Sequence, residues 1–173
     1  SRGLGDVYKR QVNTGEPKKG VTHQGYRDGS AWARGQAWGI YGSALAYKFL
    51  RDDEYADIFC KVTDYFLEHL PANGMPYWDL VFTDEDGQPW DSSALAVAAC
   101  GMLEMGRREM AEEMLKTCRD LASSEAEPDS EGLLLHGVYA YGENKGVDEP
   151  NLWGDYFYME ALTRMITDWK LYW

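Results

Sequence analysis

The stretch Thr22–Trp38, THQGYRDGSAWARGQAW, joins a polar turn to the start of a helix. Carboxylate and hydroxyl side chains at such a junction accept hydrogen bonds from the free N–H groups of a first helical turn. We therefore predict a helix from Ala31 to about Leu50, capped by Asp28 or Ser30. Its larger apolar side chains fall at helical spacing, at Trp38, Tyr41, Leu45 and Phe49.

The pattern of this helix recurs twice along the chain. The run Asp91–Ser93 precedes a nearly uncharged helix predicted from Ala94 to about Gly106, and another helix is predicted to begin near Trp153. The three cap regions, near residues 30, 91 and 153, are roughly 60 residues apart. We interpret this spacing as a structural repeat in which each unit begins with a buried inner helix.

An outer, amphipathic helix follows each of the first two inner helices. One is predicted from Asp52 or Asp53 to about His69, and the other from Arg108 to about Leu121. Long loops lead to the next inner helix, so they gather on one face, which then bears the site. The predicted fold class is all-α, built of stacked helical hairpins that form a solenoid or a toroid. The alternative is a four-helix bundle, although bundles usually have shorter loops.

Residues 1–11, SRGLGDVYKRQ, show no hydrophobic periodicity. Two interpretations are open. The segment is either non-native, since GDVYKRQ resembles translated adaptor sequence, or a disordered native leader. We exclude it from the fold and assign the domain to residues 12–173.

Composition narrows the class of partner. The chain has 173 residues, 45% of them apolar, which is enough for one compact domain with a core. A net charge of −12 argues against nucleic acid as a partner, because no basic stripe is present to displace counterions from phosphates. No apolar run approaches the roughly 20 residues that span a bilayer, so no membrane partner is expected. The spacing of the cysteines predicts buried free thiols and no metal site, for Cys60, Cys100 and Cys118.

Gln24, Trp32, Arg34 and Trp38 are the first candidates for a binding site. Flat aromatic faces suit sugar rings, and the fork of a guanidinium suits a carboxylate. Trp38 lies four residues after Arg34 and is predicted to share its helical face. A helix N-terminus adds a partial positive charge that favours an anion. These residues predict a site for an acidic sugar, and the alternative is an arginine stacked on a structural tryptophan in the core.

Other polar loop residues have plainer explanations. Four aspartates lie near the starts of inner helices, at Asp28, Asp79, Asp91 and Asp155. Two such carboxylates can serve a glycosidase, but helix capping explains Asp91 and Asp155 well, and nothing selects the other two as a pair. Lys145 is a candidate to meet an anionic group on the next sugar, and a solvated loop lysine is the alternative.

Several motifs taken together resemble the unsaturated glucuronyl hydrolases, glycoside hydrolase family 88. They are HQGY at 23–26, WARGQAWG at 32–39, PYWD at 76–79, DSSA at 91–94 and WGDY at 153–156. The resemblance implies an (α/α)6 toroid, of which this chain is about the C-terminal half. It also implies a partner, an unsaturated uronic-acid oligosaccharide released by a polysaccharide lyase.

The resemblance further implies a reaction that needs no cofactor and no metal. In the family, an aspartate protonates the C4=C5 double bond of the terminal sugar and helps a water add at C5, after which the hemiketal opens and the glycosidic link breaks. By resemblance, Gln24 and Arg34 hold the sugar acid, while Trp32 and Trp38 shape and stack the pocket.

The chain also departs from the family pattern. The two catalytic aspartates of the family belong to the first half of the toroid, so we assign no catalytic residue to this chain and expect it to be inactive alone. Members that prefer sulfated substrates share a Ser-x-x-Ser-x-Lys loop, where this chain has Ala140, Glu143 and Lys145. Losing both serines and gaining an acid argues against tight sulfate recognition. The alternatives are an unsaturated rhamnogalacturonyl hydrolase, a non-catalytic glycan-binding toroid and a structural scaffold.

Overall fold

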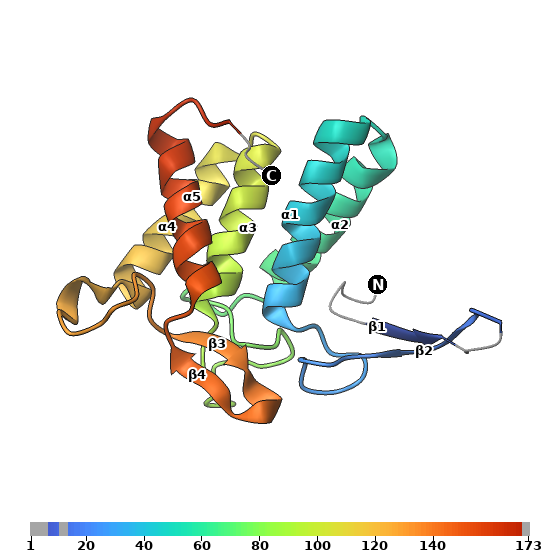
Figure 1. Ribbon diagram of the computed structural model, residues 1–173, viewed down its shortest axis with the longest axis horizontal. Helices are drawn as coiled ribbons and strands as arrows, with labels where there is room; N and C mark the ends of the chain where they lie inside the picture. Colours follow the sequence, from blue (N-terminus) through green and yellow to red (C-terminus); the bar gives the residue numbers. More distant parts are fainter. Residues whose placement is uncertain (1–6, 11–13, 171–173) are drawn as a thin grey trace.

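The computed structural model describes residues 7–10 and 14–170 (Figure 1). Within them, five α-helices make up most of the regular secondary structure, and two short antiparallel hairpins lie at one end. The helices are α1 (Ala33–Leu50), α2 (Asp53–Glu68), α3 (Ser92–Glu104), α4 (Arg108–Ala122) and α5 (Leu152–Ile166). The strands are β1 (Val7–Arg10) paired with β2 (Pro17–Val21), and β3 (Gly137–Ala140) paired with β4 (Lys145–Glu149). The predicted class was all-α, and the structure confirms it as mostly helical but adds the two hairpins.

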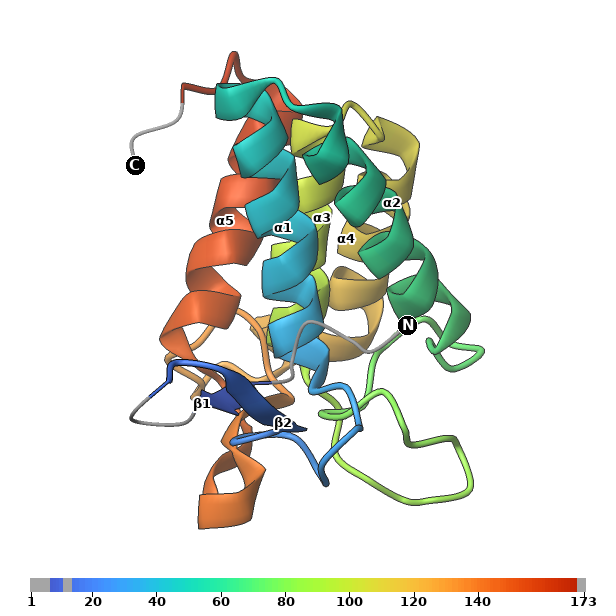
Figure 2. The same ribbon diagram turned by 90° about the vertical axis from the view of Figure 1, so that its right-hand side faces the viewer.

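Helix α3 is the centre of the fold and packs against α1, α4 and α5, while α2 packs against α1 (Figure 2). Its side chains from Ser92 to Met102 are all buried, as its nearly uncharged sequence predicts. Gly101 sets how closely α3 approaches α1. A Cβ there would lie 2.8 Å from Ile40 Cγ2 and 3.0 Å from the Tyr41 Cα, so only glycine fits without a shift of the backbone.

The predicted caps of two inner helices are wrong. Trp32 occupies the N-cap position of α1 without a side-chain cap, and Ser30 instead donates to a carboxylate in another loop. Asp91 stands at the N-cap of α3 but forms no cap hydrogen bond, because its carboxylate is used in an ion pair. By contrast Asp52 caps α2 as predicted, accepting from Glu54 N at 3.0 Å.

Asp155 and Asp28 also serve loops rather than helices. Asp155 accepts from the backbone N–H groups of Leu133 and Leu134, both at 2.9 Å, while Asn151 caps α5. Asp28 accepts from Thr22 N at 3.3 Å. Capping therefore explains neither residue, since each fastens a turn that precedes an inner helix.

Neither hairpin was predicted from the sequence, and this includes β2 at Pro17–Val21. Strands β3 and β4 lie within the predicted loop 123–151, joined by a 3-10 turn at Tyr141–Glu143 and by Asn144 in the left-handed region. Strand β1 lies within the predicted leader 1–11, and the rest of that leader lies outside the described residues. The three cysteines are free, with Cys60 half-buried and the other two buried, which confirms the predicted thiols. Among the described helices, none has the length and apolar character needed to cross a bilayer.

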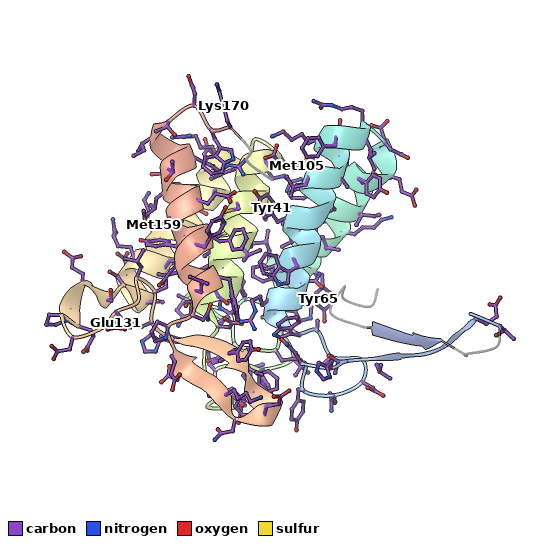
Figure 3. All side chains as sticks on the ribbon, viewed as in Figure 1. Tyr41, Tyr65, Met105, Glu131, Met159 and Lys170 are labelled. Atoms are coloured by element: carbon purple, nitrogen blue, oxygen red, sulfur yellow. The ribbon has the colours of Figure 1, made fainter. Side chains whose placement is uncertain are left out.

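Beyond the hairpin-bearing end, a polar network joins the three inner helices. Glu104 on α3 receives hydrogen bonds from Lys48 Nζ of α1 at 2.8 Å and from Arg164 Nη2 of α5 at 2.7 Å. Arg164 also donates to Tyr41, whose hydroxyl in turn donates to the buried Glu160. Figure 3 labels Tyr41 among the side chains between α1 and α5. Burial raises the pKa of Tyr41, and its hydrogen bond to Glu160 raises it further.

We expect Glu104→Gln to lower the free energy of unfolding at neutral pH by about 1–3 kcal/mol, because two cations lose their shared carboxylate. Burial alone would raise the pKa of Glu104, but Lys48 and Arg164 outweigh it and hold that pKa below its usual range. This stabilisation is therefore complete above the usual glutamate pKa of about 4.3 and is lost as the pH falls through the lowered value. Urea denaturation at neutral and acidic pH should show the difference between the two proteins shrinking in acid.

The matched control is Glu112→Gln, which removes an exposed carboxylate paired with Lys116 at 3.1 Å. It should change the free energy of unfolding by no more than about 0.5 kcal/mol. Equal effects of the two substitutions would show that the network on the inner helices does not stabilise the fold.

Candidate functional site

The N-termini of α1, α3 and α5 lie at the same end of the molecule as the β3–β4 hairpin (Figure 1). The loops that lead into these helices meet there, as the repeat predicts. The start of α1 and the loop from Met75 to Trp90 are joined by two backbone hydrogen bonds, Ala33 N to Trp78 O at 3.0 Å and Leu80 N to Ala31 O at 2.8 Å.

Arg34 is the structural centre of this end. Its side chain is 2% exposed, and Nη1 forms an ion pair with Asp91 Oδ2 at 3.0 Å. Nη1 also donates to Ser93 Oγ and to the carbonyl of Val138, and Nη2 donates to the carbonyl of Tyr139 at 2.7 Å. One guanidinium thus connects α1, α3 and β3.

Two indole rings flank this guanidinium. The Arg34 Cζ lies 4.8 Å from the ring centroid of Trp32 and 5.2 Å from that of Trp153. Trp38 lies one helical turn after Arg34 in α1, and its ring packs edge-on against Phe157 with centroids 5.0 Å apart. The residue that sequence reasoning missed is therefore Trp153, which served there only to mark the start of a helix and the WGDY motif. A tryptophan in the first turn of a third inner helix was the available signal.

The ion pair carries opposing electrostatic effects. Complete burial raises the pKa of Asp91, while the charge of Arg34 and the hydroxyl of Ser93 lower it. Burial likewise lowers the pKa of Arg34, and Asp91 opposes that shift. A pair with so many hydrogen bonds holds its charges in place, and removing one partner leaves a buried charge without compensation.

The side chains of Gln24 and Trp38 make fewer contacts within the protein than that of Arg34. The Oε1 atom of Gln24 is buried and has no hydrogen-bond partner among the described residues. Trp38 is 36% exposed and lines an apolar cavity of about 400 Å³ together with Tyr41, Tyr156 and Phe157. These two side chains are therefore available to a ligand. The Nη atoms of Arg34 are not, because they already donate to four acceptors of the protein itself.

Lys145 at the hairpin tip forms an ion pair with Glu143, Nζ to Oε2 at 2.5 Å, and both side chains are more than half exposed. Hydrogen bonding between the two lowers the pKa of Glu143 and raises that of Lys145. An anionic group approaching Lys145 therefore competes with a carboxylate that is already bound. Within the described part of the chain, no group of three or more His, Cys, Asp and Glu side chains is placed to hold a metal ion.

The chain was compared with known proteins by sequence and by structure. No family model matches the chain. The unsaturated chondroitin disaccharide hydrolase of Streptococcus agalactiae is 48% identical over 172 residues, which cover 92% of this chain and 43% of the relative. The crystal structure of the unsaturated glucuronyl hydrolase from Bacillus sp. GL1 matches with a TM-score of 0.86 at 33% identity, covering 95% of this chain and 48% of that one.

The chain is homologous to the unsaturated glucuronyl hydrolases. The resemblance carried by the motifs is thereby confirmed, since these relatives are named as unsaturated chondroitin disaccharide and unsaturated glucuronyl hydrolases. A variant of the unsaturated glucuronyl hydrolase from Streptococcus agalactiae, in complex with dGlcA-GalNAc6S, is 46% identical with a TM-score of 0.83 and covers 96% of this chain and 48% of that one. The chain spans less than half the length of these unsaturated glucuronyl hydrolases.

We expect Arg34→Lys to lower the free energy of unfolding by about 2 kcal/mol or more, because an ammonium cannot reach Asp91 and the two β3 carbonyls together and does not stack between two indoles. Urea denaturation measures the loss. The control is Arg119→Lys, which alters an exposed arginine paired with Asp120 and should leave the free energy of unfolding nearly unchanged. A loss no larger than that of the control would refute the structural role of Arg34.

Proposed function

We propose that this chain is the substrate-binding half of a glycoside hydrolase that acts on unsaturated uronyl oligosaccharides by hydration of the C4=C5 double bond. The observation that carries the proposal is the 48% identity to an unsaturated chondroitin disaccharide hydrolase, which extends over 92% of the chain. The inner and outer helices support an (α/α)6 toroid, with this chain as about its C-terminal half. Residues 12–173 then form the partial toroid domain.

Within this proposal, Gln24 and Trp38 contact the substrate. The amide of Gln24 binds the sugar acid, and Trp38 stacks against the sugar, since its ring is exposed beside an apolar cavity. Trp32 shapes the pocket from the N-cap position of α1. Arg34 was predicted to hold the sugar acid directly. Its four protein acceptors favour a positioning role instead, in which it holds Trp32 and strand β3 against the inner helices.

The catalytic aspartates are proposed to lie outside this chain. Asp91 is ion-paired and Asp79 is fully buried with its oxygens hydrogen-bonded, so neither carboxylate is available to protonate a double bond. The chain's own contribution is to bind and orient the terminal sugar, while general acid and base chemistry comes from the other half of the ring.

We expect the 173-residue chain to bind an unsaturated chondroitin disaccharide without consuming it, so the ultraviolet absorbance of the double bond stays constant. Titration calorimetry should show Trp38→Ala weakening binding by roughly tenfold, because one stacking face is lost. Phe49→Ala, which removes an exposed ring at the far end of the same helix, is the matched control and should leave affinity unchanged. Absence of binding, or hydrolysis by the chain alone, would contradict the proposal.

The hairpin tip supports a preference for unsulfated substrates, because Glu143 neutralises Lys145. We expect Glu143→Ser to raise affinity for a 6-sulfated disaccharide severalfold relative to the unsulfated one, since Lys145 is then free to meet the sulfate. Glu149→Ser makes the same change of charge elsewhere on the hairpin and serves as the control. An equal gain from both substitutions would point to net charge rather than to release of Lys145.

A further inference from the structure

Asp79 is a carboxylate whose place in the fold the proposed function does not use. It is fully buried between Trp78 and Leu80, which are buried too. Its oxygens accept three hydrogen bonds, from Tyr26 N at 2.8 Å and Ser30 Oγ at 2.7 Å to Oδ2, and from Val81 N at 3.1 Å to Oδ1. All three donors are neutral. Burying a carboxylate costs free energy unless hydrogen-bond donors compensate for the lost water. The role of Asp79 therefore depends on the segments to which these donors belong.

Two of the donors belong to the loop between Thr22 and Ser30, which contains neither helix nor strand. The remaining polar contacts of its backbone are local, such as Gly25 N to Thr22 Oγ1 at 2.8 Å. The hydrogen bond from Tyr26 N to Asp79 instead spans 53 residues of sequence. The carboxylate therefore fastens the tip of this loop to the rest of the molecule.

The backbone at Gly25 packs tightly against Thr22 and Asp79. A Cβ on Gly25 would lie 2.5 Å from Thr22 Oγ1 and 3.0 Å from Asp79 Oδ2, so the backbone runs directly over the carboxylate. Gln24 is the residue immediately before this contact. Its orientation therefore depends on where Asp79 holds the backbone of the next two residues.

The start of α1 is held separately. The backbone hydrogen bonds of Ala33 to Trp78 and of Leu80 to Ala31 need no side chain. Loss of the carboxylate should therefore release the loop tip while the inner helix stays in register.

We infer that Asp79 is a positioning residue of the binding site, which holds Gln24 toward the sugar acid through the backbone of Gly25 and Tyr26. This inference rests on the proposed function, because Gln24 is a ligand contact only there. Asp79 does not touch the sugar and takes no part in proton transfer.

The test is Asp79→Asn, which keeps the shape but places an NH₂ group against either Val81 N–H or the Tyr26 and Ser30 donors. We expect the dissociation constant for the unsaturated chondroitin disaccharide, measured by titration calorimetry, to rise roughly tenfold. The loss should be specific to binding. Glu104→Gln, which disrupts the network on the inner helices, is destabilised too but should bind the disaccharide with unchanged affinity.

A double-mutant cycle with Gln24→Ala separates positioning from mere loss of stability. If Asp79 acts through Gln24, the double variant should bind no more weakly than Gln24→Ala alone. Additive losses would overturn the inference, as would an unchanged affinity of Asp79→Asn. If the unaltered chain fails to bind the disaccharide, the proposed function itself falls. If it binds and only the coupling is missing, the positioning role of Asp79 alone is refuted.

Discussion

The ion pair between Arg34 and Asp91 is the contact on which the site-bearing end of the molecule depends. It joins residues 57 positions apart, and the same guanidinium donates hydrogen bonds to two carbonyls of strand β3. Without it, the hairpin-bearing ends of α1 and α3 would lose this polar contact, and β3 would lose the hydrogen bonds that Arg34 donates to it. Flanking indoles shield the charges and fix the plane of the guanidinium, which sets the direction of each hydrogen bond.

The inner helices divide their polar groups between two places. At the hairpin-bearing end, Arg34 of α1 holds β3, and Asp79, in the loop before α3, holds the loop that contains Gln24. In the network of Glu104 and Arg164, polar groups hold helices to one another. The buried, mostly apolar part of α3 lies between these two places. It packs so closely against α1 that Gly101 has no room for a Cβ atom. A strongly acidic chain can thus bury several ion pairs without placing them in its apolar centre.

The candidate site was predictable in composition but not in detail. The types of residue in the stretch Thr22–Trp38 indicated a site for an acidic sugar, and comparison with known enzymes confirmed the family. The roles within it depend on partners distant in sequence. Arg34 was predicted to bind a ligand because its fork suits a carboxylate. That fork meets a carboxylate of the protein itself, and sequence spacing carries no information about a pairing across 57 residues.

The sequence by itself determined the helices, since hydrophobic periodicity and small-residue runs are local, and it determined the family through motifs kept in order along the chain. Tertiary structure alone decided which aspartate caps a helix and which fastens a loop, and that Trp153 rather than Trp38 stacks on Arg34. It also decided that the segment before α5 forms a hairpin. These outcomes arise from competition between partners for the same hydrogen-bonding groups, and that competition is settled only when distant segments pack together.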